Sequence, residues 1–92
     1  MSVTPVTFFE GNYTFECPNC GNMIIVHKDD VSCAIFRHGQ FRKDGSQMNP
    51  HAPVEYCISM VRKNLIYGCG KPFMLTAKVG NIFTRALQCD YI

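Results

Sequence analysis

A pair of cysteines three positions apart is the feature that most restricts what this chain of 92 residues can fold into. The two thiols stand at the ends of the stretch Cys17-Pro18-Asn19-Cys20-Gly21. Two thiolates at this spacing, in a tight turn closed by glycine, can point at one metal ion while backbone N–H groups bond the sulfurs. The competing redox use of such a pair needs a helix that starts at the motif, and a β-branched strand pattern follows instead. The sequence therefore predicts a metal-binding knuckle of the kind that holds tetrahedral Zn²⁺.

Length and composition make a structural metal useful to this chain. Residues 1–92 are enough for a single domain, and a composition of 47% hydrophobic and 17% charged residues excludes a disordered tail or a polycation. A chain of this size buries roughly 60–65% of the surface that it exposes when unfolded, so its core alone gives marginal stability. One structural zinc ion contributes on the order of 10 kcal/mol to the folding of small domains.

The hydrophobic patterns predict a small, β-rich α+β fold with short antiparallel hairpins and one helix over about residues 53–63. Pro53 suits the first position of this helix, and an apolar stripe follows at helical spacing, formed by Val54, Cys57, Ile58, Val61 and Leu65. Strands are expected over residues 13–16, 23–28, 31–37, 72–79 and 82–92. The cysteine turn joins the first two of these strands, and Gly80-Asn81 joins the last two.

The knuckle supplies two ligands, and two more must come from elsewhere in the chain. Cys69 lies between two glycines in a second expected turn. The fourth ligand is then Cys89, near the end of the last strand, or Cys57 on the helix. The first expected site is Cys17, Cys20, Cys69 and Cys89.

A second set of nitrogen and sulfur ligands lies between the two turns. It consists of Cys33, His38, His51 and Cys57. Taken singly, Cys57 is typical of a small core residue and a lone histidine of a surface side chain. Together the four would complete a second tetrahedron, so the chain is expected to hold one or two Zn²⁺ ions. A single site built from three of the knuckle and turn cysteines and one further cysteine is the other interpretation.

The charge is unevenly distributed along the chain. Residues 1–55 carry four bases and six acids, whereas residues 56–89 carry five bases and no acid. A stretch without acids can present a basic face to phosphates. Bases and aromatic side chains also alternate over residues 36–43, although Phe36 and Phe41 could equally belong to the core. The candidate nucleic-acid contacts are Arg37, Arg42, Lys43, Lys78 and Arg85.

Catalysis is less favoured by the sequence. His38 beside Arg37 is the best candidate for a general base in a small metal-dependent nuclease, and His51 could share that role. However, no carboxylate stands at a recognised spacing from them, and neither an H-E-x-x-H motif nor a glycine-rich phosphate loop is present. Closed sites with four protein ligands also leave no position for a substrate.

The knuckle and the strand after it resemble the first half of zinc ribbons, a superfamily that includes subunits of the transcription machinery. The chain is also similar to short Cys/His-rich proteins encoded by phages and large DNA viruses. The residues that carry this second resemblance are Cys33-Ala34-Ile35-Phe36-Arg37-His38-Gly39, Asn49-Pro50-His51, Cys57 and Gly68-Cys69-Gly70-Lys71-Pro72-Phe73. It implies that Cys33, His38, His51, Cys57 and Cys69 act together. A zinc-ribbon-like fold would then carry a single cysteine in its second knuckle.

These observations lead to an expected function. The chain is interpreted as a zinc-binding module of a reducing, intracellular compartment that contacts nucleic acid, as an accessory to transcription or replication. The alternative is a protein-interaction or virion-structural module without nucleic-acid contact. Apolar runs are far shorter than the roughly 20 residues that a membrane helix needs, and no secretory signal pattern opens the sequence.

Overall fold

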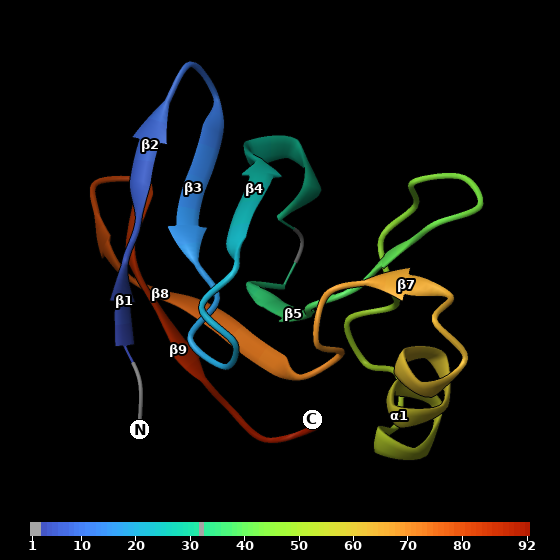
Figure 1. Cartoon of the computed structure of the whole chain (residues 1–92). Helices are drawn as coiled ribbons and strands as arrows, with labels where there is room; N and C mark the ends of the chain where they lie inside the picture. Colours follow the sequence, from blue (N-terminus) through green and yellow to red (C-terminus); the bar gives the residue numbers. More distant parts are fainter. Residues whose placement is uncertain (1–2, 32) are drawn as a thin grey trace.

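The computed structural model describes residues 3–31 and 33–92, and it has nine short strands, one α-helix and one 3-10 turn. The strands form three antiparallel sheets, which confirms the predicted β-rich α+β class (Figure 1). The bounds of the elements are β1 Val3–Pro5, β2 Thr7–Phe9, β3 Asn12–Glu16, β4 Met23–His27, η1 Lys28–Asp30, β5 Ile35–Arg37, β6 Gln40–Phe41, α1 Val54–Arg62, β7 Ile66–Tyr67, β8 Pro72–Val79 and β9 Ile82–Gln88. The first sheet has the strand order β1-β9-β8-β5, the second β2-β3-β4 and the third β6-β7.

The hairpin of β3 and β4 brings the knuckle to one end of its sheet. Alternation along β3 buries Tyr13 and Phe15, and the register sets Tyr13 opposite Val26, which is also buried. Because the register fixes which face is apolar, the turn at residues 17–22 is held at a defined place. As predicted, the cysteine turn joins these two strands.

The predicted strand over residues 31–37 is shorter than expected. Residue 32 lies outside the described residues, and Ala34 has a φ of +64°, which an extended strand does not allow. Strand β5 therefore begins only at Ile35. Its pairing with β8 sets Arg37 opposite Pro72 and brings the residue after β5 close to the loop before β8.

The helix begins and ends close to the predicted bounds, but its apolar stripe is only partly used. Cys57 is buried at 1% exposure, whereas Ile58, Val61 and Leu65 each stay more than 40% exposed. The helix contacts little besides strand β7 and the loops around it, so most of the predicted stripe faces solvent.

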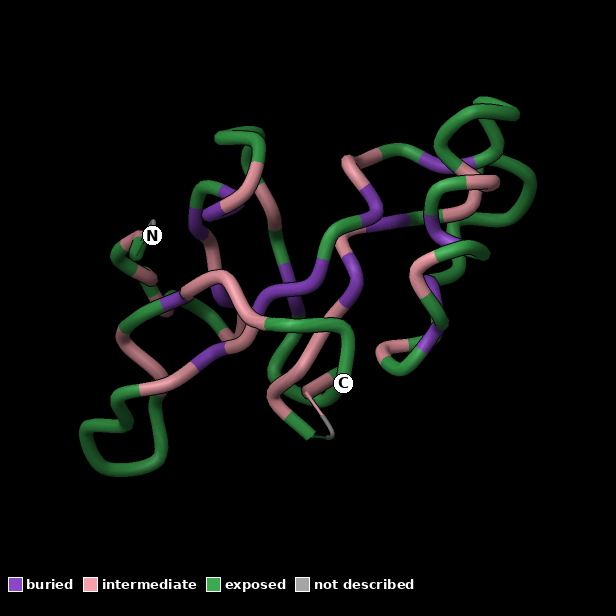
Figure 2. The backbone as a smooth tube through the Cα atoms, turned by 90° about the horizontal axis from the view of Figure 1, so that it is seen from below, coloured by how far each residue is buried: buried purple, intermediate pink, exposed green. Residues whose placement is uncertain are grey.

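Buried side chains fall into two clusters. Figure 2 marks the buried residues in purple along the backbone. The larger one lies between the two larger sheets and contains Tyr13, Phe15, Val26, Phe73, Leu75 and Ala86. The smaller one lies under the helix and contains Met48, Ala52, Cys57 and Ile66.

No helix in the described part of the chain is long and apolar enough to cross a membrane.

Candidate metal centre

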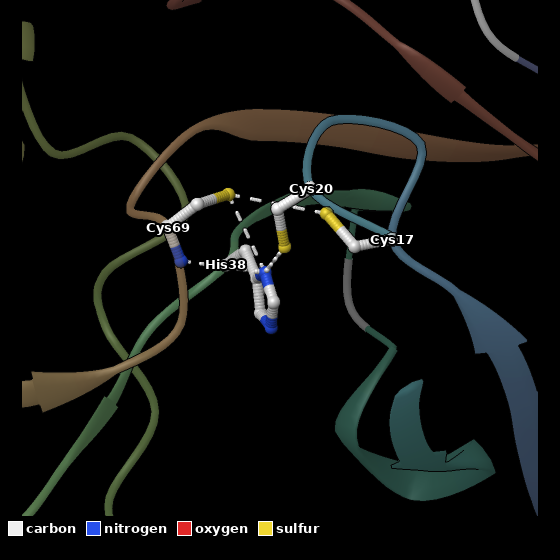
Figure 3. A group of neighbouring side chains, drawn as sticks. All are labelled: Cys17, Cys20, His38 and Cys69. Atoms are coloured by element: carbon white, nitrogen blue, oxygen red, sulfur yellow. Dashed lines mark hydrogen bonds between the residues drawn. The ribbon is translucent and has the colours of Figure 1, made fainter. Parts of the chain in front are cut away.

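Four side chains from three separate parts of the chain meet at one point. They are Cys17, Cys20, His38 and Cys69, and their candidate ligand atoms all lie within 4.8 Å of one another (Figure 3). The Cys17 and Cys69 sulfurs are 3.9 Å apart, and His38 Nδ1 lies 3.5 Å from the Cys20 sulfur and 3.4 Å from the Cys69 sulfur. This group could hold a metal ion.

The knuckle is shaped by its own backbone. The Cys17 amide donates to the Asn22 carbonyl at 2.8 Å, and the Gly21 amide donates to the Cys17 carbonyl at 2.9 Å. Gly21 has a φ of +82°, a conformation that glycine adopts without strain. The Asn19 amide also points at the Cys17 sulfur, at 3.4 Å, as a bond to a thiolate requires.

Side chains tie the knuckle to the sheet behind it. The Asn19 amide group donates to the Pro72 carbonyl at 2.9 Å, and the Gln88 amide group donates to the Pro18 carbonyl at 3.0 Å. The turn therefore keeps its position relative to strands β8 and β9, and with them to the loop that carries Cys69.

The other two members are locked together by the pairing of β5 and β8. The His38 amide donates to Lys71, and the Gly70 amide donates back to the His38 carbonyl at 2.7 Å. Gly68, with a φ of +109°, packs directly against the His38 carbonyl, where a side chain would collide. These contacts turn the His38 ring toward the three sulfurs, with its Nδ1 as the atom that faces them (Figure 3).

The sulfurs of Cys17 and Cys69 are close enough to share one proton in a hydrogen bond. The Cys69 thiol bonds the Cys17 sulfur, and this bond lowers the pKa of Cys17, with smaller contributions from His38 and from backbone amides. The same bond, together with burial, raises the pKa of Cys69. This hydrogen bond favours one thiolate in the pair, and a bound cation would displace the proton that remains.

The structure brings together three of the four residues expected for the first site and replaces the fourth. His38, which the sequence had suggested for the second set, takes the place expected for Cys89. Cys89 lies just beyond the end of β9, half-buried and outside the group. The expected place of Cys89 in this set is corrected, because the β5–β8 pairing brings His38 next to the Cys69 loop.

The second expected set does not come together as a group. His38 belongs to the first group, and the Cys57 thiol is buried against the Met48 sulfur and the Ala52 carbonyl. Burial raises the pKa of Cys57, as expected for a neutral core thiol. Only Cys33 and His51 still meet, with 3.7 Å between Sγ and Nε2. Among the described residues, no second group of three or more candidate ligands is found.

The five candidate phosphate contacts differ in exposure, because one is buried and four are exposed. Arg37 is 3% exposed, and its guanidinium donates to the Ala52 and Ile92 main-chain oxygens and covers the Tyr91 ring. Arg37 is therefore a buried structural residue, and its assignment as a phosphate contact is corrected. The other four candidates, Arg42, Lys43, Lys78 and Arg85, are exposed.

Fold and site together define a small, β-rich α+β protein with a group of three cysteines and one histidine that could bind a metal ion. No family model, curated protein or solved structure matches the chain.

Proposed function

We propose that the four-residue group holds a structural Zn²⁺ ion and that the domain it stabilises is a nucleic-acid-binding module. The observation that supports zinc is the spacing of the ligand atoms. Ligands of tetrahedral zinc, about 2.3 Å away for sulfur and 2.0 Å for nitrogen, stand roughly 3.5–3.8 Å from one another. The contacts of 3.4, 3.5 and 3.9 Å match this spacing.

A structural role follows from the number of protein ligands. Three thiolates and one imidazole fill a tetrahedron, so no position is left for water or a substrate. The group also joins the β3–β4 turn, the end of β5 and the β7–β8 loop, which are far apart in sequence. A metal here would cross-link both larger sheets and compensate for the small core.

The support for nucleic acid is a cleft between the β6 turn and the helix. Its volume is about 460 Å³, and its lining includes the aromatic rings of Phe41 and Tyr56 with the cations of Arg42 and Lys43 beside them. Tyr56 is 43% exposed. An exposed ring next to cations suits single-stranded nucleic acid, because a base stacks on the ring while phosphates pair with the cations.

The β8–β9 hairpin offers a second basic surface. Lys78 lies over the Phe83 ring, with 4.8 Å from Nζ to the ring centroid, and Arg85 is exposed on the neighbouring strand. Since no acid lies in residues 56–89, no carboxylate of this stretch opposes these cations. Both surfaces would contribute to a binding constant that falls steeply with salt.

The test is fluorescence anisotropy of labelled single-stranded DNA and RNA with the zinc-loaded protein at several salt concentrations. We expect the doubly substituted Arg42→Glu, Lys43→Glu protein to bind at least about tenfold more weakly and to show a smaller salt slope. The matched control is Lys28→Glu, an exposed cation on the turn after β4, which should bind normally. Binding unaffected by charge reversal at the cleft and also at Lys78 and Arg85 contradicts the proposal.

A protein-interaction role has one observation in its favour. Strand β4 is the edge of its sheet, and Met23 and Ile25 on it are 61% and 65% exposed. An unpaired edge with apolar side chains can accept a strand of a partner protein. Such binding would persist at salt concentrations that release nucleic acid, and Ile25→Lys would abolish it.

A further inference from the structure

A thiol and an imidazole also meet outside the metal centre. Cys33, just before β5, places its sulfur 3.7 Å from Nε2 of His51, which lies in the loop before the helix. Both side chains are exposed, and neither belongs to the four-residue group. The proposed function therefore gives this pair no role.

The hydrogen-bond partners of His51 determine which ring nitrogen carries the proton. Its Nδ1 lies 2.9 Å from the Ile92 main-chain oxygen, which can only accept, so Nδ1 is the donor. The neutral ring then presents the lone pair of Nε2 to the Cys33 thiol. The imidazole is in the form that can remove a proton from sulfur.

The ring is also held in place from the interior. The same Ile92 oxygen accepts a bond from Nη2 of buried Arg37 at 3.1 Å. On the other side, the His51 amide donates to the Asn49 side chain at 2.8 Å. Hydrogen bonds thus link a nucleophile, the Cys33 thiol, to a base, the His51 ring, and link that base to the Ile92 oxygen, which orients it.

We propose that Cys33 is a reactive thiol, that His51 is its general base, and that hydroperoxides modify it. His51 Nε2 takes the thiol proton, and the Cys33 thiolate attacks one peroxide oxygen. The S–O bond forms as the O–O bond breaks, and the proton on Nε2 passes to the departing oxygen, which leaves as water or an alcohol. The sulfur is oxidised by two electrons to sulfenic acid and the peroxide is reduced.

The two other cysteines outside the four-residue group, Cys57 and Cys89, lack this combination of access and base. Cys57 is 1% exposed, and Cys89 is half-buried with its pKa raised by burial. The Cys33 thiol has a second acceptor, the Ile35 carbonyl at 3.7 Å, but a carbonyl cannot remove its proton. Reactivity toward peroxide is therefore expected at Cys33 rather than at either of these thiols.

The experiment exposes zinc-loaded protein to hydrogen peroxide, traps sulfenic acid with a cyclic 1,3-diketone and locates the adduct by peptide mass spectrometry. We expect the adduct at Cys33 to form at least about tenfold faster than in His51→Gln, because a positioned general base typically contributes roughly 10²–10⁴-fold to a rate. Gln at this position can still bond the Ile92 oxygen but cannot take the proton. Zinc content and circular dichroism of the variant show whether it is folded.

Two controls test whether a change in the Cys33 rate is due to His51. His27→Gln changes another exposed histidine and should leave the Cys33 rate unchanged. In wild-type protein, Cys33 should also react faster when folded than in urea, whatever the stability of the variant. Equal rates in His51→Gln, or no acceleration on folding, overturn the proposal. A metal ion on the wild-type chain that Cys33→Ser removes would overturn it too, because Cys33 would then be a ligand.

Discussion

His38 is the side chain that completes the metal group, because its Nδ1 faces two sulfurs that come from different loops. It lies next to buried Arg37, so adjacent residues on one strand end have opposite roles. Strand alternation explains this, since successive side chains point to opposite faces. At the scale of the residue, the metal centre is defined by which of the nine cysteine and histidine side chains bind the metal.

Substitution of single ligands tests this assignment directly. His38→Ala should reduce bound zinc to well under one ion per chain at moderate zinc concentration, because three thiolates leave the tetrahedron open. Cys89→Ser is the matched control and should retain the full zinc content, measured by atomic emission on dialysed protein. Zinc lost with Cys89→Ser and kept with His38→Ala would reverse the assignment.

Substitution of Gly68 tests whether the backbone packs closely beside the His38 carbonyl. Its φ of +109° and its contact with the His38 carbonyl leave no room for a side chain. Gly68→Ala should therefore lower the free energy of unfolding by about 2–4 kcal/mol. Gly80→Ala, at a hairpin tip with no atom near the added carbon, should cost only about 1 kcal/mol for its positive φ. Chemical denaturation measures both, and equal losses would contradict the described contact.

At the scale of the element, the β8–β9 hairpin supports the molecule more than the helix does. Strand β8 pairs on both of its sides and carries the two largest fully buried side chains, Phe73 and Leu75. The helix contributes one fully buried residue, Cys57, and its amphipathic pattern overstates how much of it is covered. Sequence periodicity indicates which face of a helix is apolar, but it does not indicate whether a partner element covers that face.

One substitution on the helix surface and one in the core of the hairpin should differ in their effect on the free energy of unfolding. Ile58→Lys on the exposed helix face should change the free energy of unfolding by less than about 0.5 kcal/mol. Leu75→Ala in β8 should cost about 3 kcal/mol, because it leaves a cavity among fully buried side chains. Urea unfolding measures both free-energy changes. A large loss for Ile58→Lys would mean that the helix face is covered in solution.

At the scale of the whole molecule, local features were predictable and distant pairings were not. The knuckle hairpin, the last hairpin and the helix each follow from neighbouring residues, and the structure contains all three. The pairing of β5 with β8 joins segments more than thirty residues apart, and no local pattern encodes it. That pairing moves His38 to the cysteines and separates it from His51, which is why the ligand partition could not be derived from sequence spacing.

Metal removal should affect the whole fold, because the group joins both larger sheets. A zinc site contributes on the order of 10 kcal/mol, comparable with the roughly 5–15 kcal/mol total stability of a small domain. We expect a strong chelator to abolish cooperative thermal unfolding, measured by circular dichroism, and added zinc to restore it. A chelated protein with an unchanged melting temperature would show that the site is not structural.

Acidification, like metal removal, should destabilise the fold. In the metal-free chain the bond from Cys69 lowers the pKa of Cys17, so its stabilising contribution is present above the ordinary thiol pKa and is lost as the pH falls through the lowered value. In the zinc-loaded chain that proton is gone, and protons compete with the metal for every ligand. Zinc release, followed with a colorimetric chelator, should therefore increase as the pH falls. Release that increases toward alkaline pH would contradict this coupling.

The most direct test of the metal centre is native mass spectrometry of the protein under reducing conditions after expression with added zinc. We expect one zinc ion per chain, retained in Cys89→Ser and lost in Cys20→Ser and His38→Ala. Two ions per chain, or none, would contradict a single centre formed by Cys17, Cys20, His38 and Cys69.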